Sequence, residues 1–428
     1  MDVETITKCR ICGNQELISI LDLGEHSLAN RFPSANEPDP PKAPLVLVKC
    51  DDSKKSSNCG LVQLKHTVSP DELYFNHYGY RSGLNATMIT HLQNLVKEVE
   101  YRKKLLKNDL VLDIGSNDAT LLKSYSLNEL LKLGMDPTGK QFQQFYSNEI
   151  MLCPDYFNYS NFRRMSPKKA KIITSIAMFY DLPNPISFVK DIKESLDYEG
   201  LWILEQSYMP LMLFQNSFDT VCHEHLEYYA LKQIEWMVSR LGLRIVDVSF
   251  NNINGGSFRI TVCHENGPYV SNIDKLQKIT KQENEAGLDR MYPYEDFKEK
   301  VEEIKVKITN FLQNQKSLGK TTHVYGASTK GNTLLQYLKL NTDLISAAAE
   351  RNPEKFGRRT PATNIPIISE EESRNAKPDN FIVLPWHFKE EFLKREKEYL
   401  NSGGKFIFPL PNFEVINSGG IVNAFATN

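Results

Sequence analysis

The middle of the chain alternates short apolar runs with polar turns. Residues 110–114 form one such run, Gly115-Ser116-Asn117-Asp118 follow as a sharp turn, and Leu121 and Leu122 then indicate a helix. This order predicts the first βα unit of a nucleotide-binding half-sheet, in which a helix beginning near Asp118 directs its free N–H groups at a ligand. Further runs at 171–175 and 200–206 predict more buried strands of an open α/β sheet.

The last hundred residues repeat the pattern on a smaller scale. Residues 321–334 indicate strand, glycine turn and helix, and apolar runs at 344–349, 380–387 and 405–409 predict further strands. Between the two sheets, residues 272–318 are rich in Lys and Glu with apolar residues at helical spacing, which predicts solvated connecting helices. We therefore expect three parts: an N-terminal module (1–70), a doubly wound α/β domain (71–318) and a second Rossmann-like domain (319–428).

Two cysteine pairs dominate the N-terminal module. Cys9 and Cys12 are separated by two residues and followed by glycine, and Cys50 and Cys59 end in a second Cys-Gly pair. Four thiolates in such knuckles suit a closed, structural zinc site. The eight residues between Cys50 and Cys59 are polar enough to form a loop. The alternative, four unrelated cysteines, does not explain the two Cys-Gly pairs.

Composition limits the classes of partner. The 428 residues carry a formal net charge of -2 with scattered Lys and Arg, so nucleic acid is not an expected partner. No stretch approaches the roughly 20 apolar residues that cross a bilayer, and the N-terminus lacks a basic, apolar leader. We therefore expect a cytoplasmic protein with no membrane partner, whose seven cysteines are thiols or metal ligands.

The Gly115 turn favours a ligand without phosphates. A glycine lets the backbone approach a ligand closely, but the G-x-G-x-x-G pattern of dinucleotide sites is absent. Asp136 stands 21 residues later, at the end of a second predicted strand, where it could accept hydrogen bonds from ribose hydroxyls. The pair resembles the methyl-donor site of class I S-adenosylmethionine-dependent methyltransferases. A generic α/β turn is the alternative.

Residues 222–225, Cys-His-Glu-His, allow three interpretations. Cys222, His223 and His225 could bind a metal, although the H-E-x-x-H spacing is not met. The imidazoles could instead be structural. Because histidine titrates near neutrality and Glu224 could orient a neighbouring imidazole, we favour general acid/base chemistry.

Two other segments are suited to bind a polar ligand. Residues 73–91 crowd tyrosines beside Gly and Asn, which indicates either a ligand pocket or a packed hinge. Lys330 follows the Gly326 turn of the second sheet, where it could hold an anion such as a diphosphate, or could simply be a solvated helix residue.

Taken together, these motifs resemble the bacterial nucleotide-sugar C-methyltransferases along essentially the whole chain. The resemblance is carried by Cys9-x-x-Cys12-Gly13, Cys59-Gly60, Tyr78-x-Tyr80-x-Ser82-Gly83, Asp113-Ile-Gly-Ser116, His223-Glu224-His225, Gly255-Gly256-Ser257 and Gly326-Ala-x-x-Lys330-Gly-Asn332. In that family a nucleoside-diphosphate 4-keto sugar is methylated at the neighbouring carbon through an enolate. The implied cofactors are S-adenosylmethionine and a structural zinc ion, and we expect a monomer or weak homo-oligomer.

The resemblance also assigns roles to residues of this sequence. It implies that His225 is the general base and that His223 and Glu224 position it or polarise the ketone oxygen. It also implies that Tyr78 or Tyr80 contacts the sugar and could donate a hydrogen bond to the enolate oxygen. The implied methyl-donor residues are Asp113, Gly115, Ser116, Asn117, Asp118, Asp136 and Ser175. The implied substrate-binding residues are Asn85, Ser328, Thr329 and Lys330, the last three near the diphosphate.

The chain departs from the family pattern at three places. Cys222 stands where tyrosine is expected before His-Glu-His, residues 175–180 differ from the usual stretch, and the spacing of Cys50 and Cys59 is expanded. These changes leave O-methylation of a related nucleotide sugar, or a non-catalytic binding scaffold, as alternative functions.

Overall fold

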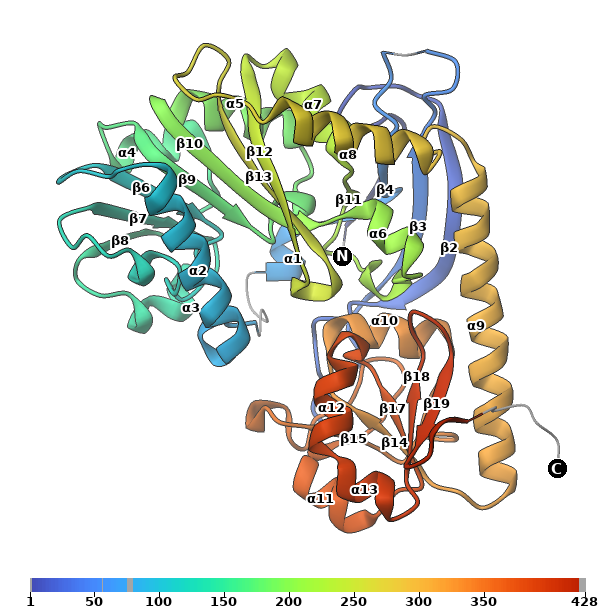
Figure 1. The fold of residues 1–428 in the computed structure, drawn as a ribbon. Coiled ribbons are helices and arrows are strands. Elements are labelled where there is room, and N and C mark those ends of the chain that lie inside the picture. Colours follow the sequence, from blue (N-terminus) through green and yellow to red (C-terminus); the bar gives the residue numbers. More distant parts are fainter. Residues whose placement is uncertain (1, 56, 75–79, 423–428) are drawn as a thin grey trace.

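Three larger sheets and one two-stranded sheet organise the described residues (Figure 1). The computed structural model describes residues 2–55, 57–74 and 80–422. In Figure 1 the N-terminal sheet lies beside the central one, and the C-terminal domain lies below both. None of the helices in these described ranges has the length and apolar character needed to cross a membrane.

The N-terminal module is a small β structure. Its elements are β1 (Val3–Thr5), β2 (Leu17–Ser27), β3 (Lys42–Cys50), β4 (Val62–Leu64), β5 (His66–Val68) and α1 (Pro70–Tyr74). Strands β2, β3 and β4 pair antiparallel, and β1 pairs with β5. A fourth strand, β11 (Glu227–Tyr228), joins the edge of β4 from the middle of the chain. The module's main sheet is therefore completed by the segment that directly follows His225.

The central domain is a seven-stranded sheet in the order β12-β13-β10-β9-β6-β7-β8. Its strands are β6 (Leu110–Ile114), β7 (Leu131–Met135), β8 (Ile150–Cys153), β9 (Ala170–Ile176), β10 (Leu196–Ser207), β12 (Leu243–Asn251) and β13 (Ser257–His264). The five strands from β6 to β10 are parallel, and β13 runs antiparallel to both of its neighbours. The carboxyl ends of the parallel strands thus meet at one edge, where open α/β sheets bind ligands.

Helices cover both faces of this sheet. On one face, α2 (Ala86–Arg102) packs its buried apolar side chains against Val111 and Ile172. On the other face, α5 (Pro185–Ser195) and α7 (Leu231–Arg240) belong to the same apolar cluster as Leu110, Leu112 and Trp202. The alternation of neighbouring β6 residues between the two clusters is that of a strand buried on both sides. The predicted doubly wound α/β sheet is confirmed.

The predicted helix beginning near Asp118 is wrong. Asn117 and Ala119 have positive φ angles of 49° and 61°, and the first regular structure after them is a 3₁₀ turn, Leu122–Ser124. Left-handed residues interrupt the run of right-handed conformations that a helix needs. The turn after β6 therefore offers backbone and side-chain groups to a ligand but no helix N-terminus.

The C-terminal domain is a second seven-stranded sheet, ordered β16-β15-β14-β17-β18-β19-β20. Its strands are β14 (Thr322–Tyr325), β15 (Ala347–Glu350), β16 (Ile367–Ser369), β17 (Asn380–Val383), β18 (Lys405–Phe408), β19 (Glu414–Asn417) and β20 (Gly420–Val422). Its helices are α10 (Thr329–Tyr337), α11 (Glu370–Ala376), α12 (Lys389–Arg395) and α13 (Lys397–Asn401). Strands β14 to β18 are parallel, so the predicted second Rossmann-like unit is present.

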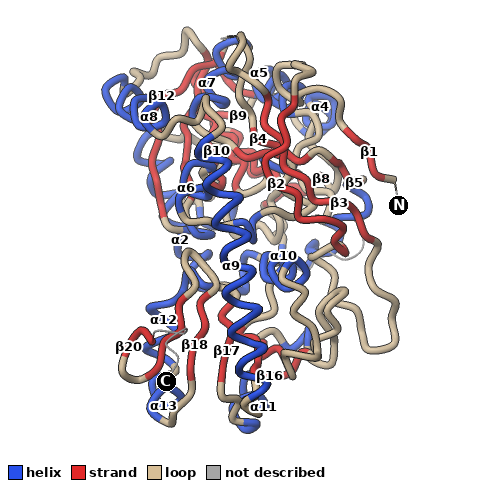
Figure 2. The backbone as a smooth tube through the Cα atoms, turned by 90° about the vertical axis from the view of Figure 1, so that its right-hand side faces the viewer, coloured by secondary structure: helices blue, strands red, loops and turns tan. Residues whose placement is uncertain are grey.

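A long helix, α9 (Tyr292–Ser317), connects the two sheets along the side of the molecule (Figures 1 and 2). The preceding helix, α8 (Ile273–Glu285), carries mostly exposed side chains, as expected. In contrast, α9 buries an apolar stripe that includes Phe297 and Ile308. This stripe belongs to one continuous apolar cluster with Leu21 of β2 and Val324 of β14. The connecting helix is therefore part of the core that joins all three parts.

Candidate active site

A cavity of about 600 Å³ opens at the carboxyl ends of the parallel strands. It is lined by residues that follow β6, β7 and β9 in the segments 113–117, 135–138 and 176–178, and by Glu205 and Gln206 of β10. This volume is in the range of cofactor and small-ligand sites. The cavity extends to Tyr80 and to Asn254 in the loop before β13.

Gly115 and Asp136 face this cavity together. Gly115 has a φ of 72°, and a Cβ added there would lie 3.1 Å from Met178 Cγ, so a side chain would be both strained and crowded. The Asp136 carboxylate accepts hydrogen bonds from the backbone N–H groups of Asn117 and Thr138, each at 2.7 Å. These bonds fix the carboxylate and leave it further acceptor capacity for a ligand hydroxyl. The arrangement fits the ribose end of a nucleoside-containing donor.

Other predicted donor residues shape the same wall. Burial raises the pKa of Asp113 to about 7, and its carboxyl accepts a hydrogen bond from Thr174 Oγ1 at 2.5 Å. Ser116 Oγ lies 2.7 Å from the Tyr146 hydroxyl. Asn117 Nδ2 donates to the Tyr80 carbonyl at 3.0 Å. Asn117 therefore ties the Gly115 turn to the segment that contains the predicted substrate residue Tyr80.

Three predicted site residues form hydrogen bonds within the protein and do not line the cavity. Asp118 accepts hydrogen bonds from Gly83 N and Thr120 Oγ1, and Ser175 Oγ accepts from Trp202 Nε1 at 3.1 Å. Asn85 caps α2 by accepting from Thr87 N at 2.9 Å. Of these three, none is among the described residues that line the cavity. Tyr78 lies outside the described residues.

His225 is the half-buried member of the His-Glu-His segment. Its Nδ1 lies 2.8 Å from the Thr220 carbonyl and must donate to it, which leaves Nε2 as the unprotonated nitrogen. Its ring packs against the edge of Tyr180, a cavity-lining residue, at a centroid distance of 4.3 Å. Burial, followed by the nearby charge of Lys330, lowers the pKa of His225 to about 3. The imidazole is therefore neutral at pH 7 and can accept a proton.

His223 and Glu224 differ from His225. The His223 ring is 2% exposed, and its Nε2 donates to the carbonyl of Ala43 in β3 at 3.0 Å. Burial lowers the pKa of His223 to about 4 and raises the pKa of Glu224. Within the part of the chain that the structure describes, residues 222–225 form no cluster of metal-ligand atoms. His223 thus joins the His-Glu-His segment to the N-terminal module, which agrees with the structural interpretation of this histidine.

The C-terminal domain reaches the cavity through Lys330. Its Nζ donates to the carbonyl of Asn254 at 3.0 Å, and Asn254 lines the cavity. Ser328 caps α10 by accepting from Gly331 N at 3.0 Å, and Thr329 is the first residue of that helix. The start of α10 and the loop before β13 therefore lie together beside the cavity.

Three residues that line the cavity, Glu205, Gln206 and Asp181, are not among the predicted site residues. Glu205 lies in an ion-pair network with His91 and Arg259. Gln206 is 1% exposed, and neither its Oε1 nor its Nε2 has a hydrogen-bond partner among the described residues. Asp181 ends the 3₁₀ turn after β9. A position at the carboxyl end of a parallel strand was the available signal for all three.

The four cysteines form a compact cluster. Their Sγ atoms lie within 4.8 Å of one another, and the Cys9–Cys59 and Cys12–Cys50 Sγ distances are both 3.5 Å. Zinc–sulfur bonds of about 2.3 Å place the sulfurs of a tetrahedral site roughly 3.8 Å apart, a spacing between the 3.5 Å of these two pairs and the 4.8 Å limit of the cluster, so the cluster fits the ion with little adjustment. A closed set of four thiolates suits a structural site.

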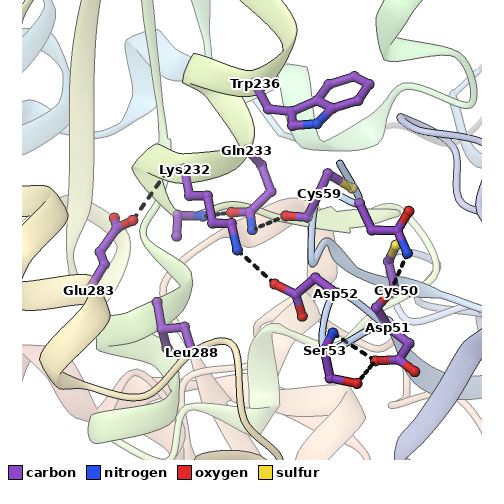
Figure 3. A network of polar contacts seen from close by, with 12 residues as sticks. Cys50, Asp51, Asp52, Ser53, Cys59, Lys232, Gln233, Trp236, Glu283 and Leu288 are labelled. Atoms are coloured by element: carbon purple, nitrogen blue, oxygen red, sulfur yellow. Dashed lines mark hydrogen bonds and ion pairs between the residues drawn. The ribbon is translucent and has the colours of Figure 1, made fainter. Parts of the chain in front are cut away.

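The zinc module docks on helix α7 (Figure 3). Gln233 Nε2 donates to the Cys59 carbonyl at 2.9 Å, and Lys232 Nζ lies 2.7 Å from Asp52 Oδ2. Trp236 Nε1 donates to the Ser57 carbonyl at 2.9 Å. The loop between Cys50 and Cys59 is thus held against the methyl-donor domain.

Three family models match successive parts of the chain. They describe a zinc binding domain at residues 9–74, a methyltransferase domain at 84–248 and a C-methyltransferase C-terminal domain at 252–411. The C-methyltransferase NovU of Streptomyces niveus is 28% identical over 425 residues, covering 97% of this chain and 98% of NovU.

Other similar proteins match a smaller share of the chain. A tRNA U34 carboxymethyltransferase of Campylobacter lari is 25% identical over 150 residues, covering 32% of this chain and 47% of that protein. Among solved structures, the mitomycin 7-O-methyltransferase MmcR is 9% identical with a TM-score of 0.33, covering 42% of this chain and 55% of that one.

The doubly wound sheet, the cavity at its carboxyl ends and the methyltransferase-domain match define a class I S-adenosylmethionine-dependent methyltransferase. With the zinc binding and C-terminal models on either side and the likeness to NovU along almost the whole chain, the protein belongs to the C-methyltransferases. The predicted fold class, methyl donor and zinc module are thereby confirmed.

Proposed function

We propose that this methyltransferase adds a methyl group to the carbon next to the ketone of a nucleoside-diphosphate 4-keto sugar. The observation that carries the proposal is His225: its Nδ1 is held by the Thr220 carbonyl, and its ring packs on a side chain that lines the donor cavity. The kind of acceptor follows from the sequence motifs shared with nucleotide-sugar C-methyltransferases.

The chain's own residues suit the methyl donor. Asp136 would accept a hydrogen bond from a ribose hydroxyl, and the bare backbone at Gly115 would let the donor lie against β6. When bound, S-adenosylmethionine supplies a methyl group on a positively charged sulfur. The apolar lining formed by Ile114, Met135 and Ile176 excludes water from this region.

His225 would act as general base on the acceptor. A ketone acidifies the neighbouring C–H bond, so Nε2 takes that proton and the bonding electron pair becomes an enolate. The enolate carbon is then the nucleophile for the new carbon–carbon bond. The Thr220 carbonyl stabilises the resulting imidazolium, because it accepts a hydrogen bond from Nδ1–H before and after the proton transfer.

Lys330 would bind the diphosphate and thereby strengthen the base. Its positive charge contributes to the lowered pKa of His225, and a neutral imidazole of such low pKa is a weak base. Phosphate charges placed beside Lys330, Ser328 and Thr329 would offset the ammonium and raise the pKa of His225. The base would then reach useful strength only when the nucleotide is in place.

Calorimetry tests the proposal. The protein is titrated first with S-adenosylhomocysteine, then with a nucleoside-diphosphate 4-keto sugar and with the same sugar carrying a 4-hydroxyl. We expect the product to bind, the keto sugar to be preferred, and deuterium next to the ketone to be lost in the presence of wild-type protein but not of His225→Ala. Preference for the hydroxyl sugar without deuterium loss would replace carbon by oxygen as the acceptor atom.

A further inference from the structure

An acidic residue, Asp181, follows directly in the chain after the tyrosine that packs against the predicted base. Asp181 ends the 3₁₀ turn Phe179–Asp181 and lines the same cavity as Gly115 and Asp136. The residue before it, Tyr180, packs its ring against His225, and the Tyr180 carbonyl accepts a hydrogen bond from Leu226 N at 2.8 Å. The segments that carry Asp181 and His225 are therefore fixed to each other at the cavity wall.

Asp181 has no positively charged partner. Its Oδ1 is buried without a hydrogen-bond partner among the described residues, and no ion pair of the described chain includes Asp181. A buried carboxyl with no cation nearby is far more stable protonated than ionised.

The groups that face Asp181 disfavour its charge further. The titratable groups around it are the Tyr74 hydroxyl of α1, and Cys222, Glu224, Glu227 and Tyr228 of the segment that carries His225. Burial, reinforced by Glu224 and Glu227, raises the pKa of Asp181 well above its ordinary value, although the Tyr74 side chain opposes this shift. Burial and these neighbours thus favour the neutral acid form of Asp181, a hydrogen-bond donor at the cavity wall, while the imidazole of His225 packs against Tyr180, which also lines the cavity.

We propose that Asp181 is a second catalytic residue, a carboxylic acid that donates a hydrogen bond to the ketone oxygen of the acceptor. This inference rests on the proposed function. As His225 takes the proton from carbon, the C–H electron pair forms the carbon–carbon double bond and the carbonyl π pair moves to oxygen. The Asp181 O–H stabilises that oxyanion and keeps its proton. When the electron pair of the double bond forms the new bond to the methyl carbon, the bond from that carbon to sulfur breaks with its pair left on sulfur, and the pair on oxygen re-forms the carbonyl.

Infrared difference spectra test the protonation state without substrate. The spectrum of wild type minus Asp181→Asn at pH 7 is expected to contain the carbonyl stretch of a protonated carboxylic acid. Carboxylate bands in its place would overturn the proposal. Asp191→Asn is the matched control, because Asp191 lines the same cavity and accepts a hydrogen bond from the backbone of Tyr159.

Kinetics with the keto sugar test the catalytic role. Losing one oxyanion donor costs about 10²- to 10³-fold in kcat, so Asp181→Ala is expected to lose that much, in kcat rather than in KM. Asp181→Asn keeps an N–H donor, so it should retain more activity and lose any alkaline limb of the pH profile that belongs to Asp181. Wild-type kcat in Asp181→Ala would refute the role, and a melting curve shows whether either variant is folded.

The two hypotheses fail in different ways. If wild-type protein neither methylates the keto sugar nor exchanges its proton next to the ketone, the proposed function is wrong, whatever Asp181 does. If wild type does both and Asp181→Ala does so equally well, only the role of Asp181 is wrong.

Discussion

Lys330 Nζ donates to the carbonyl of Asn254 at 3.0 Å and so joins the C-terminal domain to the loop that precedes β13. The Lys330 ammonium contributes to the lowered pKa values of both His225 and His387 and opposes the raised pKa of Asp219. A single cation of one domain thus acts on groups from both sides of the interface. The C-terminal domain therefore contributes a positive charge to the surroundings of His225.

Replacing Lys330 by methionine should weaken substrate binding and shift the pH profile. A lost charge-assisted hydrogen bond of about 1.5–3 kcal/mol corresponds to a decrease of roughly 10- to 100-fold in kcat/KM for the nucleotide sugar. Because the positive charge lowers the pKa of His225, its removal raises that pKa, and the acid limb of kcat/KM moves to higher pH. Lys320→Met, a more exposed lysine of the same domain, is the control. An unmoved acid limb would show that Lys330 does not act on the base.

His225 and His223 should respond differently to alanine. His225→Ala removes the base and should lower kcat by about 10²- to 10⁴-fold with little change in Tm. His223→Ala leaves the Ala43 carbonyl without its donor, which should cost about 1–3 kcal/mol of stability while the folded protein remains active. Activity assays and thermal melts on both variants make the comparison. Loss of catalysis in well-folded His223→Ala would return that residue to the catalytic set.

The buried histidines predict acid sensitivity. Folding lowers the pKa of His223 from 6.5 to about 4, so the unfolded chain binds a proton that the folded chain does not. This contribution to stability is complete above about pH 6.5 and is lost as the pH falls toward 4. Denaturant unfolding at a series of pH values should therefore show a slope that is smaller in His223→Ala. Equal slopes would mean that groups other than His223 determine the pH dependence of the unfolding free energy.

Substitutions at Asp136 and Ser175 should affect binding of the methyl-donor product differently, because Asp136 lines the cavity and Ser175 does not. Asp136→Asn should weaken S-adenosylhomocysteine binding by about 10- to 100-fold, because a hydrogen bond to a charged acceptor is lost. Ser175→Ala should leave that affinity unchanged, since Ser175 Oγ is occupied by Trp202. Calorimetry measures both affinities. Weaker binding of S-adenosylhomocysteine to Ser175→Ala would show that the ligand also depends on Ser175, which does not line the cavity.

Removing zinc should destabilise the whole protein. Losing a bound metal is one of the few changes that cost more than about 4 kcal/mol, and here it would also release the contacts of α7 with the Cys50–Cys59 loop. Chelation and Cys12→Ser should both lower Tm and activity, whereas Cys153→Ser, outside the cluster, should do so far less. A metal-free protein, verified by elemental analysis, with unchanged Tm would contradict a structural role.

Local patterns were sufficient for the strands but not for the turn after β6. Runs of apolar residues located β6, β9 and β10, because a strand buried on both faces has few polar positions. The turn was predicted as a helix start, since nothing in its composition shows that Asn117 and Ala119 adopt positive φ angles.

The sequence could indicate the role of a site residue only where its hydrogen-bond partner lies nearby in the chain. His223 and His225 are two residues apart and chemically identical, yet Ala43, 180 positions away, holds the first, while Thr220 holds the second. The sequence does not distinguish Asp181, because its protonation depends on burial and on the lack of a cationic partner among the described residues. Packing, rather than residue type, determines these roles.

Strand β11 limits how this enzyme can be engineered. Glu227 and Tyr228 pair with Gln63 and Val62, so two residues after His225 the chain enters the sheet of the N-terminal module. Exchanging residues 1–70 with those of a relative would break this pairing and displace the base. Chimaeras are therefore expected to be active only when the segment around β11 is transferred together with the N-terminal module, so that both strands of this pairing come from the same protein.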